Sequence, residues 1–323
     1  MKEIGGYLEF EHYKGTMLHE GGVLLNSGKN CLRFLLRERE IRKILVPYYL
    51  CDSVSDGCAL EGVRVRYYHT DRDFYPVDLI PDDDEWIYLV NYYGQLADSY
   101  ISAFYNKYQR VILDNVQAYF HVPQVQIDTI YSCRKFFGLS DGGILRTDVS
   151  SRYSYPQDES FERMKFLMGR FERSGSEFYG DYSRNEENTG TAAVKRMSLF
   201  TENLLHSFDY QRVEKTRTEN FRFLHEHLKG FNQLELTVPK GAFAYPLLLE
   251  YGPAVRKQLI DKKIYIPQLW PNVLRDTEKT WEEHQMSENI LPLPCDQRYD
   301  ISDMRYMVQE IVKTLKGVSI CQK

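Results

Sequence analysis

Residues 111–143 read VILDNVQAYFHVPQVQIDTIYSCRKFFGLSDGG, and this stretch decides the fold class of the 323-residue chain. Two apolar runs, RVILD at 110–114 and IDTIYS at 127–132, have the length and the β-branched content of buried strands. A third run, GGILR at 142–146, follows directly. The stretch therefore predicts three buried strands in succession.

The residues before this stretch alternate between strand and helix patterns. Apolar runs at 43–47, 63–68 and 86–92 have the pattern of buried strands, whereas 30–42 and 97–108 have a helical period. Alternating strands and helices are typical of a mostly parallel sheet covered by helices on both faces. We therefore expect an α/β fold, in which ligands bind beyond the carboxyl ends of the strands.

The second half of the chain has a different character. Residues 150–195 are polar and combine helical stretches with a long loop, and 192–228 reads as a long helix broken near His206. Four short apolar runs follow, interleaved with helical segments: LELTVP at 234–239, FAYPLLLEY at 243–251, KIYIP at 263–267 and ILPLP at 290–294. We expect a large domain at 1–215 and a smaller C-terminal α+β domain at 216–323.

Composition argues against several classes of protein. Lys and Arg number 41 against 46 Asp and Glu, a formal charge of -5, so the chain has no overall positive field for nucleic acid. No apolar run is long enough for a membrane span, and the first residues lack the apolar region of a secretion signal. The six cysteines have no CxxC pair, so neither a metal site nor a disulfide framework is indicated. We expect a folded cytoplasmic protein.

Three short segments carry candidate binding chemistry. The segment 27–29, SGK, precedes a helical pattern, where free backbone N–H groups favour a phosphate; taken alone, it is a capped helix start. Asp114 ends a predicted strand, although an Asp there is more often a cap. The segment 132–135, SCRK, leaves the next strand, and a lysine in such a loop is usually solvated. The order and spacing of the three segments are more informative about function than any one segment.

In order and spacing, these segments resemble the DegT/DnrJ/StrS family of sugar aminotransferases, which are pyridoxal-phosphate enzymes of fold type I. The resemblance runs from about residue 25 to 313, and it is clearest in VILDNVQA, in SCRKFFGLSDGG, and in YIPQLW followed by ILPLP. It implies a large domain with a mostly parallel sheet between helices, a small C-terminal domain, pyridoxal 5'-phosphate (PLP) as cofactor, and a homodimer.

The resemblance also implies roles for individual residues. Lys135, seven residues before Gly142, matches the lysine that binds the cofactor covalently and later moves a proton. Asp114 matches the acid that keeps the pyridine nitrogen protonated, which makes the ring an electron sink. Gln117 matches the Gln or His beside the ring, and Tyr93 falls near an aromatic-Gly element of the family.

Four residues fall on the family's phosphate-binding positions. Ser27, Gly28 and Lys29 lie on the phosphate loop, where the local sequence SGKNC differs from the usual Gly-Thr type. Ser132 fits the phosphate-binding serine that precedes the lysine by three residues. The resemblance therefore implies a phosphate site built from two separate parts of the chain.

Two elements depart from the family pattern. Cys51 occupies the place of the ring-stacking aromatic residue, and Tyr49 is the candidate substitute. The Asn-Tyr-Arg element that the partner subunit lends to the cofactor phosphate has no clean match, and the nearest string is DYSRN at 181–185.

The resemblance implies an aminotransferase that moves an amino group from glutamate or glutamine to the keto group of a nucleotide-activated sugar. Lys135 argues against a sister branch that removes sugar hydroxyls and has His at this position. Two alternatives stay open: a non-catalytic regulatory or scaffold protein that keeps the fold, and a different fold-type-I reaction. One such reaction, desulfuration, needs a mobile cysteine, for which Cys321 is the only candidate.

Overall fold

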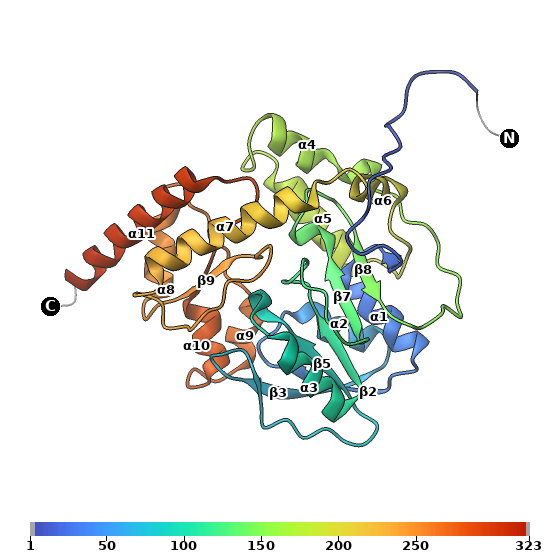
Figure 1. The fold of residues 1–323 in the computed structure, drawn as a ribbon, viewed down its shortest axis with the longest axis horizontal. Coiled ribbons are helices and arrows are strands. Elements are labelled where there is room, and N and C mark those ends of the chain that lie inside the picture. The colour runs from blue at the N-terminus through green and yellow to red at the C-terminus, as the bar shows by residue number, and fades with distance from the viewer. Residues whose placement is uncertain (1–3, 321–323) are drawn as a thin grey trace.

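A mixed eight-stranded sheet forms the centre of the protein (Figure 1). The computed structural model describes residues 4–320, so Cys321 lies outside the described residues. The strand order is β1-β8-β7-β6-β5-β2-β3-β4, and the five strands from β7 to β3 run parallel. The strands are β1 (Val23–Leu25), β2 (Lys43–Pro47), β3 (Arg64–Thr70), β4 (Pro76–Val77), β5 (Trp86–Val90), β6 (Val111–Asp114), β7 (Asp128–Ser132) and β8 (Gly143–Arg146).

Helices flank this sheet and continue into the C-terminal part. The α-helices are α1 (Gly28–Glu38), α2 (Asp52–Leu60), α3 (Asp98–Tyr108), α4 (Lys165–Glu172), α5 (Tyr179–Thr191), α6 (Leu199–Leu205), α7 (Tyr210–Leu228), α8 (Gly252–Ile260), α9 (Pro271–Asp276), α10 (Glu282–Asn289) and α11 (Ile301–Ile320). Three short 3-10 turns are η1 (Tyr92–Gly94), η2 (Cys133–Lys135) and η3 (Phe161–Arg163). The predicted α/β fold class is confirmed. No helix among residues 4–320 is long and apolar enough to cross a membrane.

Alternating side chains of the central strands enter two different cores. On one face, Tyr88 of β5 and Ile112 of β6 pack with Leu35 of α1. On the other face, Leu113 of β6 packs with Phe104 of α3. Because successive side chains of a strand point to opposite faces, helices must cover both sides of the sheet to bury them. This double cover explains why the strands read as continuous apolar runs.

The long helix predicted for 192–228 is wrong in its first part. Residues 192–198 are not helical, because the Lys195 carbonyl accepts a hydrogen bond from the backbone of Asn26 and Arg196 bridges to Leu25 at the edge of β1. Helices α6 and α7 follow, with the predicted break between Leu205 and Tyr210. Pairing with the sheet edge therefore outweighs the local helical pattern.

The C-terminal part has its own small sheet and core. Antiparallel strands β9 (Tyr245–Leu248) and β10 (Ile290–Leu293) pack with α7, α8 and α11. The runs at 234–239 and 263–267 bury Leu234 and Ile266 but form no strand. The domain division at residue 215 stays a prediction, and it falls within the continuous helix α7.

Candidate active site

The carboxyl ends of β5, β6 and β7 bring the predicted site residues into one region. In the sheet, Asp114 at the end of β6 pairs with Val90 of β5 and with Ile130 of β7. The segments that leave these strands therefore start side by side. Tyr93 follows β5, and Lys135 follows β7.

Asp114 is a buried carboxylate whose two oxygens both accept hydrogen bonds. The backbone N–H of Val116 donates to Oδ1 over 2.7 Å, and the hydroxyl of Tyr88 donates to Oδ2 over 2.9 Å. Burial raises the pKa of Asp114 above its ordinary value, while these two bonds and the charge of Lys135 act in the opposite direction. Asp114 forms no ion pair with any residue in 4–320.

Lys135 presents an amine that no described residue binds. Its side chain is exposed, and Nζ lies 5.8 Å from the centroid of the Phe243 ring, with no hydrogen bond or ion pair to a residue in 4–320. The turn beneath it is fixed, because the backbone of Cys133 donates to Gly142 and that of Phe136 donates to Cys133. The positive charge of Lys135 acts to lower the pKa of Asp114, which ends the neighbouring strand β6.

The start of α1 lies against the same strand ends. Ser27 is the N-cap residue, and its hydroxyl accepts the N–H of Asn30 over 3.2 Å. A Cβ atom on Gly28 would lie 3.4 Å from a methyl group of Val116 and 3.7 Å from Cβ of Ser132. The structure therefore brings the N-terminus of α1 next to Ser132, although the two are far apart in sequence. A helix N-terminus with free N–H groups suits a phosphate.

The side chain of Lys29 is directed elsewhere. Its Nζ donates to the carbonyl of Gly190, and its stem packs against Gly57 of α2. Burial lowers the pKa of Lys29, and the nearby charges of Asp56 and Cys51 raise it. Lys29 thus contributes the backbone of the first helical turn, while its amine joins α1 to the end of α5.

Tyr93 and Gln117 are linked and leave two buried polar atoms without partners. The backbone N–H of Tyr93 donates to Oε1 of Gln117 over 2.9 Å, and Tyr93 has a left-handed backbone with φ of 53°. Among the described residues, Nε2 of Gln117 and the hydroxyl of Tyr93 have no hydrogen-bond partner. Buried polar atoms are nearly always paired. Nε2 of Gln117 is therefore available to a bound ligand, whereas the Tyr93 hydroxyl interacts with that of Tyr49.

The two candidates for ring stacking have different surroundings. Tyr49 is fully buried, and its ring contacts the edge of the Trp270 ring at a centroid distance of 4.6 Å. Burial raises the pKa of the Tyr93 hydroxyl overall, although the Tyr49 hydroxyl acts to lower it. Cys51 is half-buried at the start of α2, with Sγ 2.8 Å from the hydroxyl of Ser53, and it lines a cavity of about 260 Å³. Cys51 thus borders a cavity, whereas Tyr49 is buried among aromatic neighbours.

The string at 181–185 lies on α5, over the lysine turn of its own chain. Asn185 donates from Nδ2 to the carbonyl of Ser140, and the next residue, Glu186, forms an ion pair with Arg134. The segment therefore covers the turn that carries Lys135 from outside.

Two residues near the site were not predicted. Tyr88 is bonded to Asp114, and period-2 alternation could have placed it on the same face of the sheet. Phe243 comes from beyond α7 and contacts both Lys135 and Tyr93, whose ring centroid is 6.3 Å away. Nothing local in the sequence indicates that approach.

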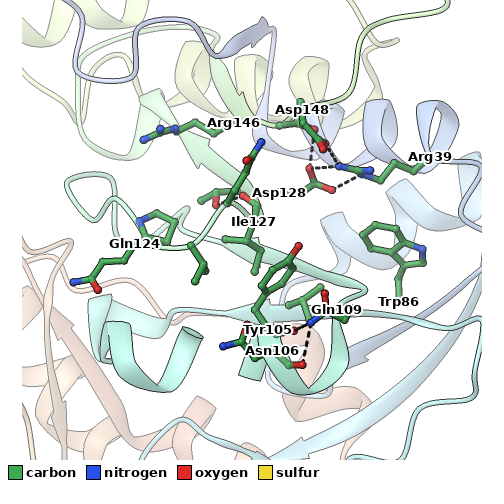
Figure 2. A pocket seen from close by; sticks show the side chains of 16 residues that line it. Arg39, Trp86, Tyr105, Asn106, Gln109, Gln124, Ile127, Asp128, Arg146 and Asp148 are labelled. Atoms are coloured by element: carbon green, nitrogen blue, oxygen red, sulfur yellow. Dashed lines mark hydrogen bonds and ion pairs between the residues drawn. The ribbon is translucent and has the colours of Figure 1, made fainter. Parts of the chain in front are cut away.

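A second cavity, of about 740 Å³, lies at the amino ends of the same strands (Figure 2). Its lining includes Trp86, Val111 and Asp128, which begin β5, β6 and β7. Arg39 closes one side by forming ion pairs with Asp128 and Asp148. Its one buried carboxylate, Asp128, is already paired with Arg39, whereas the buried carboxylate of Asp114 forms no ion pair with a residue in 4–320.

The geometry fits PLP, which has a phosphate, a ring nitrogen, a phenolic oxygen and an aldehyde. The N-terminus of α1 and the hydroxyl of Ser132 can take the phosphate, and Asp114 can take the ring nitrogen. The free amine of Lys135 can take the aldehyde, and the unpaired Nε2 of Gln117 can donate to an acceptor atom of the ring.

Neither a family model nor a curated protein matches the sequence. Solved structures match the fold. A DegT DnrJ EryC1 StrS aminotransferase from Brucella abortus has 16% sequence identity and a TM-score of 0.59 over 90% of this chain and 85% of its own. PseC of Helicobacter pylori, an aminotransferase of pseudoaminic acid biosynthesis, has 13% identity and a TM-score of 0.66 over 91% and 86%.

A third match carries the aminated form of the cofactor. Spr1654 from Streptococcus pneumoniae, in its PMP form, has 13% identity and a TM-score of 0.65 over 92% of this chain and 88% of its own. At these identities the likeness concerns the fold. The chain therefore has the fold of the DegT/DnrJ/EryC1/StrS sugar aminotransferases.

Proposed function

We propose that the protein is a PLP-dependent aminotransferase. The observation that carries the proposal is the position of two groups: a buried acid, Asp114, ends β6, and an amine with no partner among residues 4–320, Lys135, follows the adjacent parallel strand β7. The N-terminus of α1 lies at the same edge, and the fold is that of known aminotransferases.

Four residues would hold the cofactor. Ser27, Gly28 and Ser132 would bind its phosphate, and Asp114 would accept a hydrogen bond from its ring nitrogen. The bound group supplies an electron sink that makes a proton on the adjacent substrate carbon acidic. Lys135 would hold the cofactor covalently before the substrate arrives.

Lys135 would then act as the general base and acid. Its Nζ would take the proton from the substrate carbon and would later return a proton to the reacting group. Asp114, in its ionised form, would accept the hydrogen bond of the ring nitrogen and favour its protonated state. The Phe243 ring lies 5.8 Å from Nζ, measured to the ring centroid, and would flank the amine on one side.

For the substrates, we infer glutamate or glutamine as amino donor and a keto-sugar nucleotide as acceptor. The support is the fold likeness to sugar aminotransferases, among them PseC, whose pathway makes pseudoaminic acid. The protein would act in the cytoplasm as a homodimer, with a small C-terminal domain beyond about residue 215.

Absorbance spectroscopy tests the proposal. Purified protein given PLP should show the visible band of a lysine-bound cofactor, and glutamate should replace it with the band of the aminated cofactor. Lys135→Ala should abolish the visible band, whereas Lys107→Ala, an exposed lysine on α3, should keep it. A bound cofactor that stays unchanged with every amino donor would indicate a non-catalytic protein and contradict the proposal.

A further inference from the structure

The neighbouring strand supplies a hydroxyl to the candidate acid. Tyr88 of β5 and Asp114 of β6 point to the same face of the sheet, and the Tyr88 hydroxyl donates to Oδ2 over 2.9 Å. The Tyr88 side chain is only 2% exposed, so water does not compete for this bond. The bond therefore holds the Asp114 carboxylate in one orientation.

Other groups near Asp114 have partners of their own. The hydroxyl of Tyr68 donates to the carbonyl of Tyr88 over 2.8 Å, and that of Tyr92 donates to the carbonyl of Tyr49 over 2.5 Å. Val116 contributes a backbone N–H from the other side.

The charge of Lys135 acts to lower the pKa of Asp114, but Lys135 forms no hydrogen bond or ion pair with it. Among residues 4–320, Tyr88 is thus the one side chain that forms a hydrogen bond with Asp114.

We propose that Tyr88 is a positioning residue, whose hydroxyl keeps the Asp114 carboxylate ionised and oriented toward the ring nitrogen of the cofactor. This inference rests on the proposed function and deepens it. The assignment explains why Tyr88, which carries a hydroxyl, occupies a core that is otherwise largely apolar. Val90 of β5 and Ile44 of β2 are buried in the same core.

The physical argument concerns the charge on Asp114. Burial opposes ionisation, and each donated hydrogen bond stabilises the charged form. Burial also raises the pKa of Tyr88 well above its ordinary value, so its hydroxyl stays a donor at all working pH values. Removing that donor should raise the pKa of Asp114 by about one unit.

Cofactor-analogue binding tests this inference without any enzymatic turnover. The probe is 4'-deoxypyridoxine 5'-phosphate, which keeps the ring nitrogen but lacks the aldehyde, so Lys135 forms no covalent bond with it. Its dissociation constant is measured by calorimetry between pH 5 and 8 for the wild type and for Tyr88→Phe. The probe titrates equally in both experiments, so the ratio of the two constants isolates the protein's contribution.

The ratio of the Tyr88→Phe constant to the wild-type constant should rise about tenfold as pH falls, which corresponds to a shift of one pKa unit. The same probe with C–H in place of the ring nitrogen should give a ratio independent of pH. Tyr68→Phe, which removes a buried hydroxyl that does not touch Asp114, is the matched control and should give a flat ratio.

A second variant covers the case in which Tyr88→Phe fails to fold. Site-specific Tyr88→3-fluorotyrosine makes the hydroxyl a stronger hydrogen-bond donor. The loss of probe affinity on acidification should therefore occur at a lower pH than in the wild type. If the variant folds and binds the probe, but the ratio of its dissociation constant to that of the wild type does not change with pH, the role of Tyr88 is overturned. The proposed function would not be affected by that result. Failure of the wild type to bind the probe overturns the proposed function together with this inference.

Discussion

Gly143 lies directly against Ser27: a Cβ atom at position 143 would come within 2.4 Å of the Ser27 carbonyl carbon. It would also lie 2.7 Å from the backbone nitrogen of Gly28. Gly143 pairs with Leu25 of β1 and with Ser132 of β7. One missing side chain thus lets the start of α1 approach the strand ends, where the phosphate of the cofactor would bind.

Substituting Gly143 should therefore weaken cofactor binding. In Gly143→Ala, the new methyl group meets backbone atoms, so the start of α1 must move and PLP affinity should fall tenfold or more. Fluorescence titration with PLP measures the change. Gly180→Ala, on α5 with open space around its Cβ position, is the control and should bind PLP like the wild type. If Gly143→Ala binds PLP as tightly as the wild type, the close approach of Gly143 to Ser27 is not needed for phosphate binding, and the prediction is wrong.

Asp114→Asn should retain the cofactor but slow the reaction. A neutral amide does not hold the proton on the ring nitrogen, so the electron sink weakens. We expect the rate of the glutamate half-reaction to fall by at least about a hundredfold, which corresponds to about 3 kcal/mol in the barrier. Stopped-flow absorbance measures it, and an unchanged rate would remove Asp114 from the mechanism.

Glu61 ties α1 to α2 and should make stability depend on pH. It accepts hydrogen bonds from Arg33 over 2.7 Å and from Arg37 over 2.6 Å. Burial alone would raise the pKa of Glu61, but the bonds and charges of the two arginines outweigh it and leave the pKa below its ordinary value. The ionised form therefore stabilises the fold above the unfolded-state pKa, and this contribution is lost as pH falls through the folded pKa.

Glu61→Gln should accordingly reduce the free energy of unfolding at pH 7 by about 1–2 kcal/mol. The difference from the wild type should shrink as pH falls below the ordinary pKa of a glutamate, and it should be lost once pH has passed the lowered pKa of Glu61 in the folded state. Urea unfolding at several pH values measures it. Glu187→Gln, exposed on α5, serves as the control and should change little. A difference of the same size at pH 3 and pH 7 would rule out the ion pairs as its source.

The sequence allowed the position of a site residue to be predicted where that residue ends a strand or directly follows one. Asp114 and Lys135 could be located because parallel strands end at a common edge of the sheet, so local pattern and topology together place the residues at and just beyond the strand ends. Ser27 could be placed because an N-cap serine has a local signature. The proposed chemistry of these residues remains a prediction.

Contacts between distant segments were not predictable in the same way. Phe243 approaches Lys135 across more than a hundred residues, and the side chain of Lys29 turns toward Gly190 rather than the strand ends. The segment at 192–198 has a helical pattern, yet it pairs with the sheet edge at Leu25. In each case a tertiary contact outweighs local preference, and a single sequence does not encode that contact in any short pattern.

Reduction with borohydride tests the central claim most directly. Protein incubated with PLP, reduced, digested and analysed by mass spectrometry should carry one phosphopyridoxyl group, on the peptide that contains Lys135. Lys135→Ala should carry none after the same treatment. Modification of another lysine in the wild type, or none at all under saturating PLP, would contradict the assignment of Lys135 and the function built on it.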